Sequence, residues 1–247
     1  MARARAVLAR PDSRWLCVRM CEEIADRLSF MSLDVRRALV IGEGMDAVLR
    51  HHSNADVFRL DLTDAGHPDI VAEEDRLPIA DASMDLVIAV GTLDTVHDLP
   101  GALLLIRRIL RPGGLFLGAM LGAGSLPALR EKLTQFETDA GGNLAARFHP
   151  QVDVRAAGDL LFRAGFSTPV ADHDMVTASY KDIRGLIGDI RATSANALPK
   201  VQPLARDAAQ RLVQEPAWAE QFGILYLTGW GPVAGEVRPA GPVKGSY

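Results

Sequence analysis

Short, nearly continuous apolar runs alternate along this chain with segments of helical period. The runs typical of strands are Arg37–Gly42, Val57–Asp61, Asp69–Ala72, Met84–Val90 and Leu115–Leu121, of which Asp69–Ala72 is the weakest. Strands that are apolar on successive residues are expected where helices cover both faces of a sheet. The pattern therefore predicts an α/β fold with an open, parallel sheet.

A well-delimited helix connects the last two of these strands. Asp98 and Pro100 supply its start signals, and Pro112-Gly113-Gly114 supplies its stop. A strand, a helix and a strand in this order form the parallel crossover unit, which is nearly always right-handed.

The chain divides into three parts. Residues 1–36 are predicted to form an N-terminal arm and helix, residues 37–230 the main domain, and residues 231–247, rich in glycine and proline, a disordered tail. Beyond the first five strands, the main domain has predicted helices at 125–139 and 154–164, strands at 170–176 and 222–228, and a helical insert at 178–222. An insert between the last two strands can form a lid that selects the substrate.

Composition limits the function classes. The chain is 48% apolar and 23% charged, as in a soluble globular protein, and its net charge of -4 argues against a nucleic-acid partner. No apolar run approaches the ~20 residues of a membrane span. Cys17 and Cys21, the only two cysteines, are predicted to be buried free thiols. Free thiols fit a reducing compartment, so a cytoplasmic location is expected.

Glycine and acidic residues follow three of the predicted strands. Gly42-Glu43-Gly44 follows the first strand, Asp61 ends the second, and Glu73 and Glu74 follow the third. Glycine lets a ligand approach the backbone, and open α/β sheets bind ligands at the carboxyl ends of their strands. A ribose can donate both hydroxyl protons to Asp61, and an exocyclic amine can donate to Glu73 or Glu74. Each acid alone is typical of a solvated loop, but together they form a more specific arrangement.

In their order and spacing these pieces resemble a class I S-adenosylmethionine-dependent methyltransferase. The resembling stretch includes Ala38–Gly44, Asp61-Leu62, Glu73–Ile79, Ser83–Val87, Leu93–Asp98 and Leu110–Gly114. The resemblance implies a Rossmann-like fold with a mostly parallel seven-stranded sheet, helices on both faces, and S-adenosylmethionine as cofactor. It implies the methionine part at Gly42–Gly44 and Gly91, the ribose at Asp61, and the adenine near Glu73 and Glu74. The implied cofactor-binding residues are Ile41, Gly42, Glu43, Gly44, Asp61, Leu62, Glu73, Glu74 and Gly91.

Further segments narrow the resemblance to one branch of the family. These segments are Asp98–Leu103, Gly118–Gly122, Leu129-Arg130, Ala164–Phe166 and Tyr226–Trp230. The branch comprises the methyltransferase-like assembly factors of respiratory complex I and, more distantly, the malonyl-carrier-protein methyltransferases of biotin synthesis. It includes a protein that hydroxylates an arginine of a complex I subunit, so complex I assembly is an alternative role.

The chain departs from the family pattern at the glycine turn. Val40 and Asp46 stand where the family has an acid and a third glycine, and Glu73 stands where it has an aspartate. Asp94-Thr95 also replaces the His-Trp or Glu-His that the family usually carries there. The departure at Asp46 bears on cofactor binding, because it puts a side chain where the backbone normally lies against the cofactor.

The candidates for catalysis, His97 and Asp94, follow the fourth strand. Either can orient or deprotonate an acceptor, although His97 is equally typical of a surface residue near a helix start. Methyl transfer depends mainly on positioning, so no fixed catalytic signature is expected. Asp172-His173-Asp174 carries metal-ligand atoms, but alternation on a strand separates His173 from both acids. A charge cluster is therefore favoured there, and no metal site is predicted.

Three functions remain open. The first is methyl transfer to a small molecule, a carrier-bound acyl group or a protein side chain. The second is an oxidative modification or assembly role, and the third is non-catalytic binding with a degenerate glycine turn. A nicotinamide-dependent dehydrogenase is disfavoured because Ala47 replaces the last glycine of the Gly-x-Gly-x-x-Gly pattern. The sequence assigns neither the acceptor nor the oligomeric state.

Overall fold

A seven-stranded sheet forms the centre of the computed structural model, which describes residues 14–139, 148–192, 206–215 and 217–233. The strand order is β3-β2-β1-β4-β5-β7-β6. The strands are β1 (Arg37–Gly42), β2 (Asp56–Asp61), β3 (Ile70–Val71), β4 (Met84–Val90), β5 (Leu110–Leu121), β6 (Ser167–Tyr180) and β7 (Trp218–Trp230). The pairs among β1 to β5 are parallel, whereas β7 is antiparallel to both β5 and β6. The prediction of a mostly parallel seven-stranded α/β sheet is confirmed.

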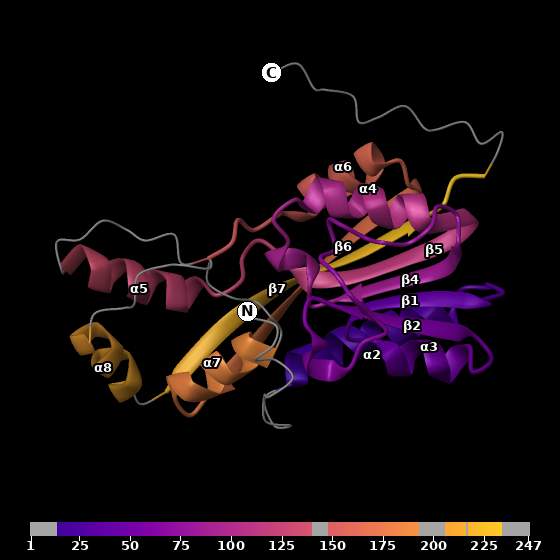
Figure 1. The fold of residues 1–247 in the computed structure, drawn as a ribbon. Helices are drawn as coiled ribbons and strands as arrows, with labels where there is room; N and C mark the ends of the chain where they lie inside the picture. Colours follow the sequence, from indigo (N-terminus) through magenta and orange to yellow (C-terminus); the bar gives the residue numbers. More distant parts are fainter. Residues whose placement is uncertain (1–13, 140–147, 193–205, 216, 234–247) are drawn as a thin grey trace, which may run out of the picture.

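Helices cover both faces of this sheet (Figure 1). They are α2 (Trp15–Ser29), α3 (Met45–His51), α4 (Leu99–Ile109), α5 (Pro127–Asp139), α6 (Val154–Ala164), α7 (Ile183–Ala192) and α8 (Arg206–Gln214), with two 3-10 turns, η2 (Asp64–Gly66) and η3 (Leu93–Thr95). α2 and α3 lie on one face, and α4 and α6 lie on the other.

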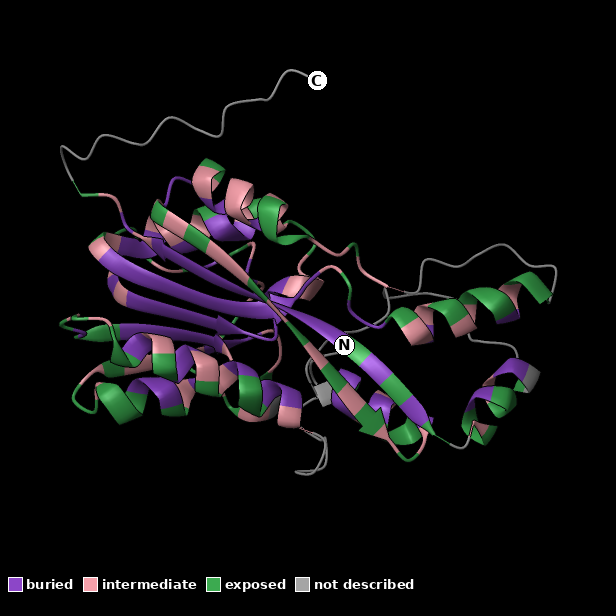
Figure 2. Cartoon of the chain, turned by 180° about the vertical axis from the view of Figure 1, so that it is seen from behind, coloured by how far each residue is buried: buried purple, intermediate pink, exposed green. Residues whose placement is uncertain are grey.

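Successive side chains of the central strands enter two separate cores. Val40 and Ile88 pack in the core that contains the α2 side chains, whereas Leu39 and Val87 pack in the core that contains those of α4 and α6. The central strands are therefore buried along nearly their whole length (Figure 2). This double burial is the physical reason for the continuous apolar runs in the sequence.

β6 and β7 continue well beyond the end of β5. β5 ends where Leu121 pairs with Ile224, but β6 and β7 remain paired from Asp174–Ile224 to Tyr180–Trp218. We call the two-stranded part beyond that pair, residues 175–180 and 218–223, the ribbon. It lies among α5, α7 and α8 (Figure 1).

The ribbon occupies both ends of the stretch 178–222, for which a helical insert is predicted. The described helices of that stretch are α7 and α8. On the β6 side of the ribbon, exposed and half-buried residues alternate, as on a strand with one solvated face. A strand of this kind lacks the continuous apolar run that marks β1 and β4.

The predicted N-terminal helix lies within the described residues, whereas the predicted arm and tail do not. α2 supplies the predicted N-terminal helix, while the arm at residues 1–13 and the tail from residue 234 onward lie outside the described residues. Within the described part of the chain, no helix is long and apolar enough to cross a membrane.

Candidate active site

Two backbone bends meet where β1 and β4 end side by side. Gly42 pairs with Val90 in the register of these strands, so Gly42–Gly44 and Gly91 lie at the same edge of the sheet. The φ angles of Gly42, Gly44 and Gly91 are 77°, 113° and 67°. Glycine adopts this left-handed region without the strain that a Cβ atom would cause.

Close packing also excludes side chains from this turn. A Cβ atom on Gly42 would lie 2.3 Å from Cγ2 of Thr92 and 2.6 Å from the carbonyl oxygen of Val90. A Cβ atom on Gly44 would lie 3.0 Å from Cγ2 of Ile88. Glycine at these two positions therefore lets the turn pack tightly against the end of β4 and Thr92.

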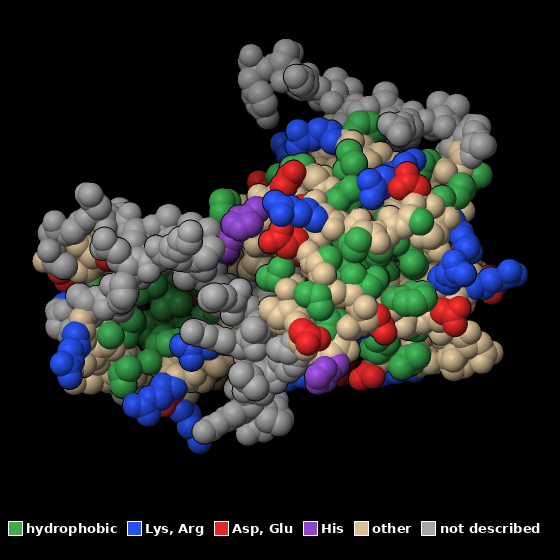
Figure 3. Space-filling model, viewed as in Figure 1, with side chains coloured by type: hydrophobic (Ala, Val, Ile, Leu, Met, Phe, Trp, Pro, Cys, Tyr) green, Lys and Arg blue, Asp and Glu red, His purple; other side chains and the backbone are tan. Residues whose placement is uncertain are grey.

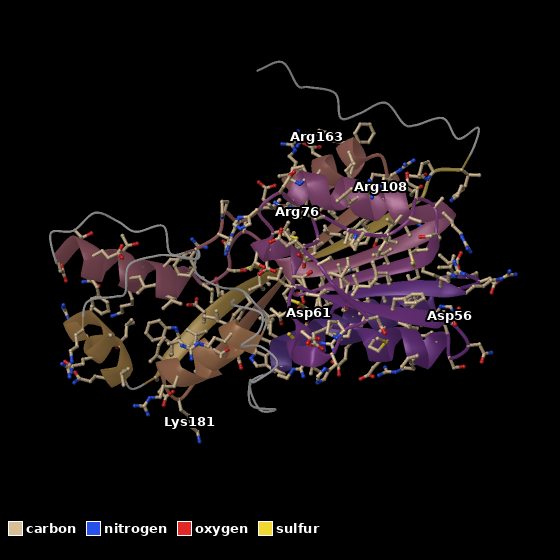
Figure 4. All side chains as sticks on the ribbon, viewed as in Figure 1. Asp56, Asp61, Arg76, Arg108, Arg163 and Lys181 are labelled. Carbon is tan, nitrogen blue, oxygen red and sulfur yellow. The ribbon has the colours of Figure 1, made fainter. Side chains whose placement is uncertain are left out.

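The carboxylate of Asp61 lies at the same edge, at the end of β2. Figure 4 shows Asp61 and Asp56 at opposite ends of that strand. Oδ1 of Asp61 accepts a hydrogen bond from the amide of Leu62 at 2.7 Å, and Oδ2 lies 3.7 Å from Nη2 of Arg59. One oxygen is thus fixed by the backbone, and the other has only a loose ion pair.

The loop after β3 carries two neighbouring acids in different surroundings. Glu74 is buried, with 3% of its surface exposed, whereas Glu73 is half-buried. Oε2 of Glu73 lies 3.4 Å from Nε of Arg76, which Figure 4 shows near the Asp61 end of the sheet. Of the two acids, Glu73 is therefore the one accessible to a ligand.

The start of α2 lies against the glycine turn. Arg14 forms an ion pair with Glu43, and both side chains are little more than one-third exposed, at 38% and 39%. The pKa of the Cys17 thiol is raised to about 12, mainly by burial and to a smaller extent by the charges of Glu43 and Asp94, whereas the charge of Arg14 lowers it. The start of α2 therefore lies beside the glycine turn. Cys17 is buried and Cys21 half-buried, and both are free thiols.

A pocket lies next to this region, at the carboxyl end of β5. It is lined by Asp94, Leu121, Leu126, Arg130, Phe148, His149, Pro150 and Gln151. One wall is anchored to β7, because the amide of Leu126 donates to the carbonyl of Gln221 at 2.8 Å. The φ of Leu126 is 62°, a conformation that strains a residue with a side chain and that clusters at functional sites.

Arg130 supplies a positive charge to this pocket. Its Nε donates to the carbonyl of Ser125 at 3.2 Å, and its guanidinium carbon lies 4.1 Å from the centre of the Phe148 ring. Burial lowers the pKa of Arg130, and the charge of Glu220 opposes this shift. Glu220 is itself engaged by the amides of Ala128 and Leu129. Among the described residues, no carboxylate forms an ion pair with Arg130.

The structure separates the two predicted catalytic residues. Asp94, in η3, lines the pocket, whereas His97 is exposed in the loop before α4 and does not line it. The side chain of the next residue, Asp98, accepts a hydrogen bond from the amide of Gly101 at 2.9 Å and so caps α4. Asp98 thus acts as the predicted helix start signal.

The two acids of Asp172-His173-Asp174 form ion pairs with arginines of α2. Asp172 and Asp174 each lie 2.6 Å from an arginine of α2, Arg27 and Arg19 respectively, whereas His173 is exposed on the alternate position of β6. Within the described ranges, no group of three or more His, Cys, Asp or Glu side chains is arranged to hold a metal ion. The cluster fastens α2 to the sheet, and Figure 3 shows further charges of both signs interspersed over the surface.

Residues 38–118 match the methyltransferase domain family. The chain is also 30% identical to the mitochondrial arginine-hydroxylase NDUFAF5 of Homo sapiens, over 89% of this chain and 72% of that protein. The chain belongs to the class I S-adenosylmethionine-dependent methyltransferase family. It is also 27% identical to a second relative, the malonyl-[acyl-carrier protein] O-methyltransferase of Gallionella capsiferriformans (strain ES-2), over 87% of this chain and 76% of that protein.

Two solved structures share the fold. The YcgJ protein of Bacillus subtilis superposes with a TM-score of 0.56 at 12% identity, over 87% of this chain and 99% of that one. Phosphoethanolamine N-methyltransferase 2 of Haemonchus contortus, solved with S-adenosylhomocysteine, superposes with a TM-score of 0.52 at 16% identity, over 87% of this chain and 53% of that one.

S-adenosylmethionine is the cofactor of this methyltransferase family, and the residues present fit it. Gly42 and Gly44 adopt left-handed conformations at the carboxyl edge of the sheet and carry no side chain that would stand between the backbone and a ligand. The carboxylate of Asp61 can accept hydrogen bonds from hydroxyl groups. Asp46, at the place of the family's third glycine, has an exposed side chain in the first turn of α3, so it does not fill the turn.

Among the residues that line the pocket, sequence reasoning proposes a functional role for Asp94 alone. Arg130 belongs to the Leu129-Arg130 pair that the chain shares with its branch of the family, which is the one available signal. Phe148 and Gln151 have none, because they reach the pocket only through the fold. Nε2 of Gln151, for example, donates at 3.1 Å to the carbonyl of Ser125, 26 residues earlier.

Proposed function

We propose that this methyltransferase transfers a methyl group to an acceptor that carries a carboxylate, bound in the pocket between η3 and α5. The observation that carries the proposal is Arg130, a partly buried guanidinium with no ion-pair partner among the described residues. A buried charge is costly unless it is paired. Because guanidinium and carboxylate groups match in a two-pronged geometry, an acceptor carboxylate supplies the missing charge.

A carboxylate acceptor suits the chemistry of the pocket. When bound, S-adenosylmethionine supplies a methyl group activated by its sulfonium centre. A carboxylate oxygen is already deprotonated at neutral pH, so its methylation releases no proton and needs no general base. Asp94 then orients the acceptor by accepting a hydrogen bond from a donor beside the carboxylate. Orientation of this kind supplies much of the acceleration. We also propose that His97 contacts the acceptor from outside the pocket.

We propose the following cofactor contacts. The backbone of Ile41–Gly44 and Gly91 lies against the methionine part, Asp61 and Leu62 hold the ribose, and Glu73 accepts from the adenine amine, with the buried Glu74 supporting its loop. The glycine conformations, the available oxygen of Asp61 and the accessibility of Glu73 support this assignment. The free thiols support a reducing, cytoplasmic location as part of the same proposal.

The named relatives suggest two acceptors, a carrier-bound malonyl group and an arginine side chain. Arg130 favours the malonyl group, because two guanidinium groups repel one another in one pocket. Asp94 is the observation that favours the second candidate, because its carboxylate could pair with an acceptor arginine. We also propose that α7 and α8, between the strands of the ribbon, help to cover the bound acceptor.

Methyl-labelled S-adenosylmethionine tests the proposed acceptor. Malonyl-carrier protein should gain a base-labile methyl ester, while acetyl-carrier protein, which lacks the free carboxylate, should gain none. Arg130→Met should abolish the labelling and Arg130→Lys should restore part of it. Lys132→Met is the matched control, because Lys132 lies on the same helix but pairs with Glu215 at 2.9 Å. An enzyme that binds S-adenosylhomocysteine but labels no malonyl group would refute the proposal, and oxygen incorporated into an arginine peptide would favour the second candidate.

A further inference from the structure

The ion pair of Arg14 and Glu43 lies beside the bare backbone of the glycine turn. Glu43 stands between Gly42 and Gly44, and both members of the pair remain about one-third exposed. The charges of both residues act on the buried thiol of Cys17, which lies in the first turn of α2. Two opposite charges are thus held next to a backbone that is open to a ligand.

The turn that carries this pair lacks the acidic residue with which the family pattern begins. Val40 occupies the place of the family's acid, and it is fully buried in the core beneath α2. Over residues 40–46 the remaining acids are Glu43 and Asp46, and Asp46 is an exposed residue of α3. Glu43 is therefore the carboxylate of this segment that is held in place by a cation.

We propose that Arg14 and Glu43 together bind the zwitterionic amino-acid end of the cofactor. Glu43 accepts hydrogen bonds from the α-ammonium group, and Arg14 donates to the α-carboxylate. Neighbouring charges of opposite sign match a zwitterion, and hydrogen bonds between charged groups are the strongest available. A partly exposed ion pair contributes little by itself, so it rearranges around a ligand at small cost. Glu43 thereby supplies the negative charge that Val40 lacks.

Contacts of the next residue hold Arg14 in position. Nε1 of Trp15 donates to the carboxylate of Asp189 and, at 3.2 Å, to the hydroxyl of Tyr180. The indole ring also meets the ring of Phe222 edge-on, with 5.5 Å between their centres. These contacts attach the start of α2 to α7 and the ribbon. Such preorganisation lowers the entropy that ordering Arg14 around a ligand would cost.

Calorimetry with two ligands tests this proposal independently of any acceptor. S-adenosylhomocysteine carries the amino-acid end, whereas 5′-methylthioadenosine lacks it. Glu43→Gln and Arg14→Gln should each weaken S-adenosylhomocysteine binding about tenfold and change methylthioadenosine binding less than about twofold. Asp46→Asn and Arg19→Gln are the matched controls and should leave both affinities unchanged, because Asp46 is exposed on α3 and Arg19 pairs with Asp174.

Masked ligands assign the two charges separately. Arg14→Gln should not weaken the methyl ester of S-adenosylhomocysteine, and Glu43→Gln should not weaken its N-acetyl derivative. Equal losses for S-adenosylhomocysteine and methylthioadenosine would overturn the proposal, since they would indicate a distorted turn. Unchanged affinities, or a wild-type protein that binds neither ligand, would also overturn it. Failure of the carboxylate-acceptor proposal would leave these affinities as they are.

Discussion

At the scale of single residues, a comparison of Gly42 and Gly113 distinguishes two destabilising effects of an added methyl group, backbone strain and overpacking. Their φ angles are nearly equal, at 77° and 75°. A Cβ atom on Gly113 meets nothing within 4 Å, whereas on Gly42 it would meet Thr92 at 2.3 Å. Gly113→Ala should therefore lower the free energy of unfolding by about 1 kcal/mol through backbone strain. Gly42→Ala should lower it by about 3 kcal/mol, because overpacking adds to the strain. Urea denaturation measures both, and equal losses would contradict the tight contact.

The thiol of Cys17 should resist alkylation in the folded protein. Burial is the main reason that its pKa is raised from 9.0 to about 12, and only the thiolate reacts readily. At pH 8, iodoacetamide should modify Cys17 at least about a hundredfold more slowly in the native protein than in urea. The same pKa shift affects stability. Because the folded state holds the thiol proton more tightly than the unfolded state, the shift stabilises the folded protein below pH 9.0, and this stabilisation is lost as pH rises from 9.0 towards about 12. Rapid native alkylation followed by mass spectrometry would show that α2 opens readily.

At the scale of elements, the first turn of α5 depends on one carboxylate from β7. Glu220 is 1% exposed, and its oxygens accept hydrogen bonds from the amides of Ala128 at 3.1 Å and Leu129 at 2.8 Å. Glu220→Ala should destabilise the protein by about 3 kcal/mol, because buried amides lose a charged acceptor. Hydrogen exchange should also quicken at the start of α5. The control Glu215→Ala removes only a partly exposed ion pair with Lys132 of the same helix and should cost no more than about 1 kcal/mol, and a similar effect of the two substitutions would rule out this anchoring.

How well an element can be predicted depends on how local its determinants are. β1 and β4 have the bounds that their apolar runs predict, because both faces are buried. β6 and β7 extend further than predicted, since the ribbon alternates in burial on its β6 side. The glycine turn is a local motif and can be found in the sequence. The pocket cannot, because Arg130 and Gln151 converge on the carbonyl of Ser125 only after α5 is attached to β7.

At the scale of the whole molecule, Asp189 joins α7 to the start of α2 and to β6. It is 3% exposed, and it accepts hydrogen bonds from Trp15 and, at 2.8 Å, from Tyr180. Burial raises the pKa of Asp189 above 3.8, although both hydrogen bonds oppose the shift. The folded state therefore holds this proton more tightly, and the associated stability is present below pH 3.8 and is lost as pH rises through the folded pKa.

The stability difference between Asp189→Asn and wild type should accordingly shift in favour of the variant as pH rises from 3.8. Paired urea denaturations across this pH range measure the difference, which removes the contribution of other carboxylates. A difference that does not change with pH would show that Asp189 is not perturbed by burial. The exposed variant Asp34→Asn provides the matched background, because Asp34 lies on the surface, 3.7 Å from Arg36.

The position of β7 between β5 and β6 has a consequence for synthesis of the chain. β5 ends at Leu121 and its partner β7 ends at Trp230, so the ribosome must translate residues 122–230 before this edge of the sheet is covered. At ~5–20 residues per second, that interval lasts roughly 5–20 s. Throughout it the nascent chain carries an apolar strand with an unpaired edge, which is a template for association with other chains. A chaperone that binds this edge during the interval between β5 and β7 would therefore protect the growing chain from association.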